Sequence, residues 1–197
     1  MSSDLQSPIA QLPVKVIYEG DWVRMKVQGN WEFVERVHGR GMAVIIIAVT
    51  RENKVVFVEQ DRIPLGRRTI EMPAGLVGDT AGDDDSEDTL ESAARRELEE
   101  ETGYVTDEME VLLIGPTSAG LTNERIAYVR AGNLTRKHKG GGVDDENIVV
   151  HEVPVDEAPA WLLAKQAQGF ELDLKLWGGL WMIEHHLDGR KRTAGND

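Results

Sequence analysis

Three glutamates in the middle of the chain have the type and spacing needed to bind a metal ion. Glu97, Glu100 and Glu101 stand three and four positions apart, so on a helix their carboxylates share one face. Like charges at this spacing repel, and no basic residue stands four positions from Glu97 or Glu101. Oxygen ligands favour Mg²⁺ or Mn²⁺. The spacing alone therefore leaves two interpretations open, a divalent-metal site and a solvated acidic helix face.

The residues around these glutamates predict a helix over 89–102. Apolar side chains recur at helical spacing at Leu90, Ala93, Ala94 and Leu98. Gly103 follows as a typical C-terminal stop. Upstream, residues 76–88 are rich in Gly and Asp and show no periodicity, which indicates a loop.

The rest of the chain alternates between strand and helix patterns. Residues 14–18, 22–27 and 31–37 alternate in polarity and are separated by turn residues, which predicts an antiparallel meander. Residues 43–49 are continuously apolar, as expected for a central strand buried on both faces. Further predicted strands are 54–58, 109–114, 126–130 and 148–153, and further predicted helices are 156–168 and 173–186. This order favours a mixed α/β or α+β sandwich.

Composition narrows the function classes. The chain has 197 residues and a formal net charge of −13, which argues against binding nucleic acid or an anionic membrane surface. An acidic protein that handles phosphates needs metal cations to do so. The chain has no cysteine, which excludes disulfides and thiol catalysis. The N-terminus lacks a signal-peptide pattern, and the longest apolar run, 42–49, is too short to span a membrane, so we expect a cytoplasmic protein.

The glutamate helix, together with Pro73-Ala74-Gly75, resembles the Nudix box, G-x5-E-x7-R-E-U-x-E-E-x-G-U, where U is bulky and apolar. Residues 96–104 read RELEEETGY and fit its second half position by position. The first half departs, because twelve residues separate Gly75 from Asp88 where the motif has five, and Asp88 replaces a glutamate. Asp88 could support Arg96 or cap the helix, with Glu91 three residues on.

Other segments resemble the ADP-ribose pyrophosphatase branch of the Nudix hydrolases. They are 31–36, 58–62, 70–75, 118–124 and 144–148. The resemblance implies an α/β (α+β) Nudix fold, with a mixed β-sheet sandwiched between helices and an N-terminal antiparallel β meander. It implies that residues 1–40 form a dimerisation subdomain and 41–197 the catalytic domain.

The resemblance also implies roles for individual residues. Metal ions would be bound by the Ala74 carbonyl and by Glu97 and Glu101, and Glu100 would be a further ligand or would support the ligands from behind. Glu146, or its neighbour Asp144, would be the base that takes a proton from the attacking water, and Glu100 would also take part in catalysis. Arg62 would contact the diphosphate. Trp31 would stack on a base or pack in the core or dimer interface, and Glu124 would lie near the substrate or stabilise its loop.

These implications lead to one principal function. We expect hydrolysis of ADP-ribose to AMP and ribose 5-phosphate with Mg²⁺ or Mn²⁺ by a homodimer whose site is shared between subunits. The alternatives are cleavage of other nucleoside diphosphate sugars or dinucleotides, and a non-hydrolytic module that binds ADP-ribose. We expect no nucleic-acid or membrane partner.

Overall fold

The computed structural model describes residues 7–78, 88–143 and 146–185. Most of the acidic insertion (79–87), the alternative base Asp144, and the predicted end of the last helix at His186 lie outside the described residues.

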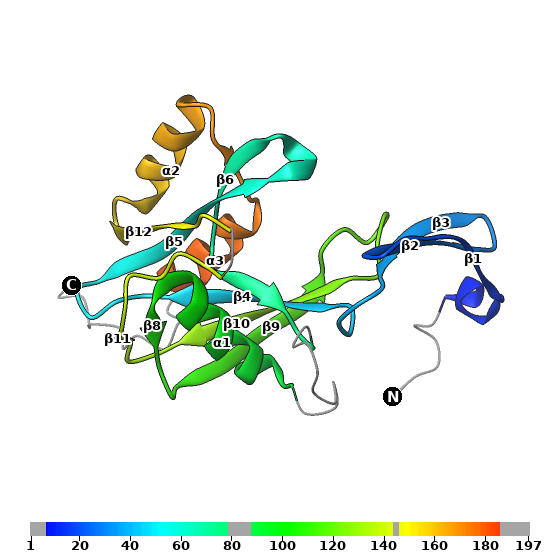
Figure 1. The fold of residues 1–197 in the computed structure, drawn as a ribbon, viewed down its shortest axis with the longest axis horizontal. Coiled ribbons are helices and arrows are strands. Elements are labelled where there is room, and N and C mark those ends of the chain that lie inside the picture. The colour runs from blue at the N-terminus through cyan, green and yellow to red at the C-terminus, as the bar shows by residue number, and fades with distance from the viewer. Residues whose placement is uncertain (1–6, 79–87, 144–145, 186–197) are drawn as a thin grey trace.

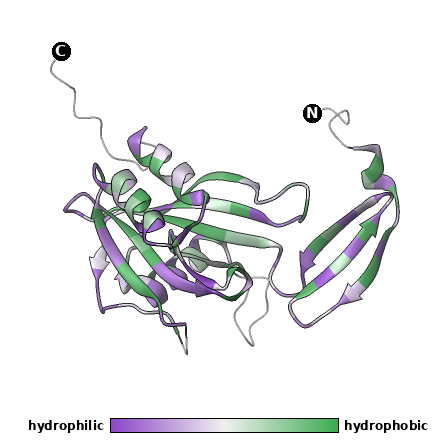
Figure 2. Cartoon of the chain, turned by 90° about the horizontal axis from the view of Figure 1, so that it is seen from above, coloured by the Kyte–Doolittle hydropathy of each residue, from purple (hydrophilic) through white to green (hydrophobic). Residues whose placement is uncertain are grey.

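The N-terminal meander forms as predicted and projects from the rest of the molecule (Figure 1). After a short 3₁₀ helix, η2 (Pro8–Gln11), strands β1 (Val14–Glu19), β2 (Val23–Gln28) and β3 (Trp31–Arg36) pair antiparallel in that order. Hydrophobic and hydrophilic residues alternate along these strands (Figure 2). Many of their apolar side chains remain exposed, because no helix of the described chain covers this sheet.

Two four-stranded sheets form the body of the protein. The first has the order β7-β4-β10-β9 and contains β4 (Met42–Ala48), β7 (Ala74–Leu76), β9 (Met109–Pro116) and β10 (Arg125–Ala131). In this sheet β4 and β10 run parallel and the other pairs antiparallel. The second has the order β12-β5-β6-β13 and contains β5 (Lys54–Arg62), β6 (Arg67–Glu71), β12 (Val149–Pro154) and β13 (Glu171–Leu172). A 3₁₀ turn, η3 (Ile63–Leu65), joins β5 to β6, and β8 (Tyr104–Val105) pairs with β11 (Thr135–Arg136).

Helices cover both sides of this body, which confirms the predicted sandwich. Helix α1 (Leu90–Thr102) packs on one side, and α2 (Ala158–Ala167) and α3 (Lys175–Glu184) pack on the other. Alternate residues of β4 enter the two cores: Val44 and Ile46 join the cluster with α1, whereas Ile45 and Ile47 join the cluster with α2 and α3. The run 43–49 is continuously apolar because both of its faces are buried.

Several elements differ from the sequence prediction. Strands β6, β7, β8, β11 and β13 were not predicted, and α3 begins at Lys175 rather than at residue 173. The Asp173 carboxylate instead accepts a hydrogen bond from the Lys175 N–H (2.8 Å) at the start of α3. Within the described residues, no helix is long and apolar enough to cross a membrane.

Candidate active site

Helix α1 is fixed at both ends by local interactions. Thr89 is its N-cap, and Thr89 and Ser92 exchange the reciprocal hydrogen bonds of a capping box. The interpretation of Asp88 as the cap is therefore wrong. Its carboxylate accepts hydrogen bonds from the Gly78 N–H (2.8 Å) and the Ser92 hydroxyl (2.5 Å). Asp88 thus ties together the two ends of the acidic insertion.

The face of α1 that carries Glu97 and Glu101 borders a cavity of about 320 Å³. The short strand β7 passes across this face so closely that a Cβ on Gly75 would lie 1.9 Å from the Glu97 carboxyl carbon. The Ala74 N–H donates to Glu101 (3.1 Å). A side chain at residue 75 would therefore displace the Glu97 carboxylate, and Gly75 is the glycine that lies against the glutamate helix despite the longer loop.

The carboxylates of this face are held in an environment that disfavours negative charge. Burial raises the pKa of Glu101 well above its ordinary value, the Ala74 hydrogen bond offsets part of this rise, and the charges of Glu97 and Glu146 add to it. Burial also raises the pKa of Glu97 to about 7, although Arg96, whose guanidinium lies 2.7 Å away, counteracts the rise. A hard cation would relieve both effects.

The donor set fits Mg²⁺ or Mn²⁺ in its chemistry, since it consists of oxygen ligands on a buried acidic face. Among the described side chains, however, no group of three or more His, Asp or Glu is arranged as a finished metal cluster. Glu97 faces Arg96, Glu100 lies 3.6 Å from the same guanidinium, and Glu101 faces the Ala74 N–H. Glu100 is not among the residues lining the cavity.

Glu146 enters the same cavity from a loop that rests on the C-terminal end of α1. The Gly141 N–H donates to the Glu101 carbonyl (2.9 Å) and the Gly142 N–H to the Glu100 carbonyl (3.0 Å). These carbonyls belong to the last turn of the helix and lack partners within it. The Glu146 carboxylate accepts a hydrogen bond from the Val143 N–H (3.0 Å). The structure thus brings the predicted base and the predicted metal helix to one cavity.

Arg62 and Glu124, to which the resemblance gives roles near the substrate, also line this cavity. Arg62 forms two parallel hydrogen bonds with Glu71 (both 2.7 Å). Burial would raise the pKa of Glu71, but the Arg62 hydrogen bonds and charge hold it below its ordinary value. Glu124 pairs with Arg36 at the end of β3, and this contact links the meander to the body.

The structure does not bring every predicted residue to the cavity, and it adds some that were missed. Trp31 lies at the start of β3 with half of its surface exposed, away from this cavity within the single chain. Its stacking on a base stays a prediction. The cavity is also lined by Arg36, Gln60, Glu71 and Lys175, to which no role was given. In the sequence, a role for Glu71 was indicated only by its position in the segment 70–75. Its pairing with Arg62 has no sequence signal, because Arg62 belongs to the neighbouring strand.

Residues 39–174 match the family model of the NUDIX domain, which is more than half of the chain. The chain belongs to the Nudix family. It is 40% identical over 125 residues to the methanol dehydrogenase activator of Bacillus methanolicus, covering 63% of this chain and 64% of that protein. It is 35% identical over 117 residues to the ADP-ribose pyrophosphatase of Bacillus subtilis, covering 59% of this chain and 60% of that protein.

A GDP-mannose pyrophosphatase of Cronobacter sakazakii is 36% identical over 149 residues, and the alignment covers 71% of each protein. The chain spans slightly less than two thirds of the length of the methanol dehydrogenase activator and of the ADP-ribose pyrophosphatase. The crystal structure of an ADP compounds hydrolase superposes with a TM-score of 0.70, covering 92% of this chain and 95% of the other at 15% identity. That likeness concerns the fold alone and agrees with the predicted Nudix fold.

Proposed function

We propose that this Nudix protein hydrolyses the pyrophosphate bond of ADP-ribose, giving AMP and ribose 5-phosphate, with Mg²⁺ or Mn²⁺ as cofactor. The observation that carries the proposal is the cavity in which Glu97 and Glu101 from α1 meet Glu146 and Arg62. Two metal-binding carboxylates, a separate carboxylate and a fixed guanidinium are the groups that attack on a charged diphosphate requires.

In this proposal the carboxylates of Glu97, Glu100 and Glu101 and the Ala74 carbonyl hold the metal. When bound, Mg²⁺ supplies charge neutralisation of the diphosphate and lowers the pKa of a coordinated water. Glu100, which lies 3.6 Å from the Arg96 guanidinium, would be a ligand or would lie behind the ligands. Glu146 accepts the proton of the attacking water, because it borders the cavity from outside the helix that binds the metal.

Arg62 orients the diphosphate. Its guanidinium is planar and always charged, which suits phosphate oxygens. Glu71 holds this side chain through two hydrogen bonds, so it needs little reordering when substrate binds. Glu124 and Arg36, which pair at the junction with the meander, also line the cavity and would contact the nucleoside or the sugar.

A different nucleoside diphosphate sugar is the principal alternative substrate, because a GDP-mannose pyrophosphatase is among the relatives. The carboxylates and Arg62 act on the shared diphosphate and do not distinguish the groups on either side of it. A non-hydrolytic ADP-ribose-binding module is less well supported, since Glu97, Glu100, Glu101 and Glu146 are all present.

We further propose a homodimer in which the exposed meander meets a second copy of the chain. Apolar side chains in and beside the strands of this sheet are 45–70% exposed, which is unusual for a surface without a partner; they are Val14, Val16, Ile17, Tyr18, Trp22 and Trp31. Contact with a second copy could bring Trp31 to the substrate base. A cytoplasmic location stays a proposal supported by the sequence alone.

The experiment is a kinetic comparison of ADP-ribose with GDP-mannose and other nucleoside diphosphate sugars at fixed Mg²⁺. We expect the highest kcat/KM for ADP-ribose, and loss of turnover with a chelator and in Glu101→Gln. Faster turnover of GDP-mannose than of ADP-ribose would change the proposed substrate and leave the proposed pyrophosphate hydrolysis unchanged. Binding of ADP-ribose with no turnover of any compound would instead favour the non-hydrolytic module.

A further inference from the structure

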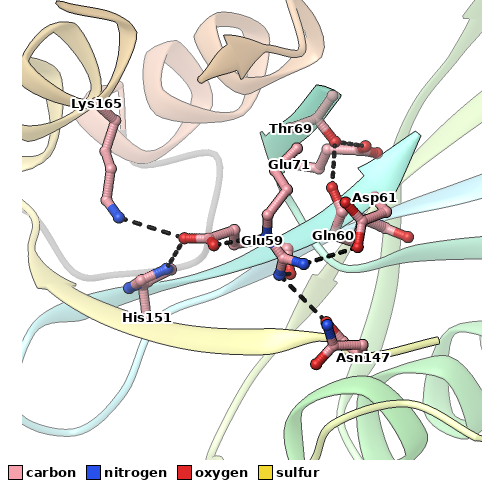
Figure 3. Close-up of polar contacts among 9 residues, drawn as sticks. Glu59, Gln60, Asp61, Thr69, Glu71, Asn147, His151 and Lys165 are labelled. Carbon is pink, nitrogen blue, oxygen red and sulfur yellow. Dashed lines mark hydrogen bonds and ion pairs between the residues drawn. The ribbon is translucent and has the colours of Figure 1, made fainter. Parts of the chain in front are cut away.

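A second polar cluster lies on the β12-β5-β6 sheet and is centred on Glu59 of β5. Its carboxylate lies 2.9 Å from His151 Nε2 of β12 and 3.3 Å from Lys165 Nζ of α2 (Figure 3). The Arg68 Nε of β6 donates to its other oxygen at 2.8 Å. Three cationic or hydrogen-bonding side chains from three elements thus meet one carboxylate.

The Glu59 cluster is firmly held. Only 11% of the Glu59 side chain is exposed. Burial alone would raise its pKa, but the hydrogen bonds from His151, Arg68 and Lys165 lower it below the ordinary value. Glu59 is therefore an ionised, fully engaged anchor at neutral pH.

This cluster lies on the opposite face of the sheet from the cavity. Side chains alternate along a strand, so Glu59 and Asp61 point to one face of β5, and Gln60 and Arg62, which line the cavity, point to the other. Arg68 pairs in register with Asp61 and shares its face. No atom of Glu59, Asp61 or Arg68 borders the cavity.

Arg68 connects this anchor to the loop that carries Glu146. Its Nη1 donates to Asp61 (2.8 Å), and its Nη2 donates to the main-chain carbonyls of Glu59 (3.1 Å) and Asn147 (3.2 Å). Asn147 directly follows Glu146 and has a left-handed backbone (φ 51°), which costs free energy in a residue other than glycine.

The hydrogen bond to Asn147 occurs where sheet pairing ends. The ladder between β12 and β5 stops at the pair Val149 and Glu59. On the N-terminal side of this pair, the chain turns away toward the cavity. The Arg68 hydrogen bond holds the loop at that point, just as the main-chain hydrogen bonds to β5 hold β12.

We propose that Arg68 is a positioning residue that fixes the main chain at Asn147 and thereby holds the Glu146 carboxylate at the reaction centre. The proposal rests on the proposed function, in which Glu146 takes the proton from the attacking water. Arg68 acts from the back of the sheet and does not touch substrate. Its loss should therefore affect kcat and leave KM nearly unchanged, because a small displacement of a general base is costly.

The test is a double-mutant cycle between Arg68→Ala and Glu146→Gln, with ADP-ribose and Mg²⁺. We expect Arg68→Ala to lower kcat about ten- to a hundredfold with KM changed less than about threefold. In the Glu146→Gln background the same substitution should cause no further loss, since the group it positions is already inactive. Arg67→Ala is the matched control, because Arg67 is the adjacent arginine and instead contacts Gly169 and Glu171.

Arg68→Lys keeps the charge of the cluster and provides a folded variant if alanine destabilises the chain. The three N–H donors of lysine are on a single nitrogen, which cannot reach Glu59, Asp61 and Asn147 at the same time as the three guanidinium nitrogens do. The kcat of Arg68→Lys should therefore also fall. Parental kcat in both Arg68 variants, or an equal loss of kcat in the presence and absence of Glu146, would overturn the positioning role. Full activity of Glu146→Gln would instead refute the assignment of Glu146 as the base. Failure of the proposed function is therefore distinguishable from failure of the positioning role of Arg68.

Discussion

Glu97 and Glu101 are carboxylates that the surrounding chain makes costly to ionise. Both are largely buried and both have raised pKa values; the charge of Glu97 adds to the rise of Glu101, and the charge of Glu146 adds to both. In a protein without metal, this arrangement stores electrostatic repulsion. The same arrangement favours binding of a divalent cation, which is why the metal and the stability of the fold should be linked.

The first prediction concerns the metal-free protein. A raised pKa means that the folded state binds more protons than the unfolded state, so stability falls as pH rises above the ordinary value of 4.5. For Glu97 the loss continues as the pH rises through about 7, and the direction is the same for Glu101. We expect Glu101→Gln to raise Tm at pH 8 in a chelator by about 3 °C or more, measured by thermal denaturation.

Glu99→Gln is the matched control, since Glu99 is on the same helix but is 41% exposed and pairs with Lys137. Added Mg²⁺ should raise the Tm of the parent and of this control, and have little effect on Glu101→Gln. A Tm for Glu101→Gln at or below that of the parent in chelator would show that the buried charge is not a source of instability.

The second prediction separates the base from the metal ligands. Glu146→Gln removes the proton acceptor and leaves α1 intact, so we expect kcat to fall about a hundred- to ten-thousandfold while Mg²⁺ still raises Tm. Steady-state kinetics and thermal denaturation with Mg²⁺ measure the two effects. A kcat within about threefold of the parent would exclude Glu146 as the base.

At the scale of elements, the proposed reaction centre depends on the contact between α1 and the glycine loop. Three consecutive glycines, 140–142, form this loop beside the end of α1. In the structure they all have positive φ, and two of them donate to the last carbonyls of α1. A Cβ on Gly140 would lie 2.4 Å from the Glu101 carbonyl oxygen. Glycine is required here by close approach as well as by conformation.

The third prediction follows from this contact. Gly140→Ala should separate the loop from α1, lower stability by about 1–2 kcal/mol or more and reduce kcat, because Glu146 and the metal helix lose their common support. Gly115→Ala is the control, since a Cβ there meets nothing within 4 Å. Equal stability and kcat for the two variants would contradict the proposed role of the contact.

The sequence predicts those elements whose pattern is local. Helix α1, strands β1 to β4 and residues 54–58 of β5 follow from periodicity and turn residues alone, whereas the continuation of β5 to Arg62 was missed. The box motif locates the acidic cluster. Strand β6 is missed because Arg67 and Arg68 are charged, and their partners, Glu171 and Glu59, lie elsewhere in the chain. The hydrogen bond between Arg68 and Asn147 joins residues 79 positions apart. No spacing rule in the sequence predicts it.

At the scale of the whole molecule, the meander is a sheet whose apolar side chains lack a covering layer within the described chain. The fourth prediction is a homodimer in light scattering at micromolar concentration. Ile17→Glu, in the exposed edge strand β1, should weaken it because it places like charges at the contact. Leu163→Glu is the control, since Leu163 is similarly exposed but lies on α2. A parent protein that is monomeric would contradict the dimer.

The most direct measurement for the whole account is product analysis of ADP-ribose turnover in ¹⁸O-labelled water with Mg²⁺. The proposed reaction adds one water across the pyrophosphate bond. It should therefore give AMP and ribose 5-phosphate in equal amounts, with one labelled oxygen in one of the two phosphate groups, and a chelator should prevent the reaction. Release of ADP and free ribose, or no turnover of ADP-ribose and other nucleoside diphosphate sugars, would contradict pyrophosphate hydrolysis by this cavity.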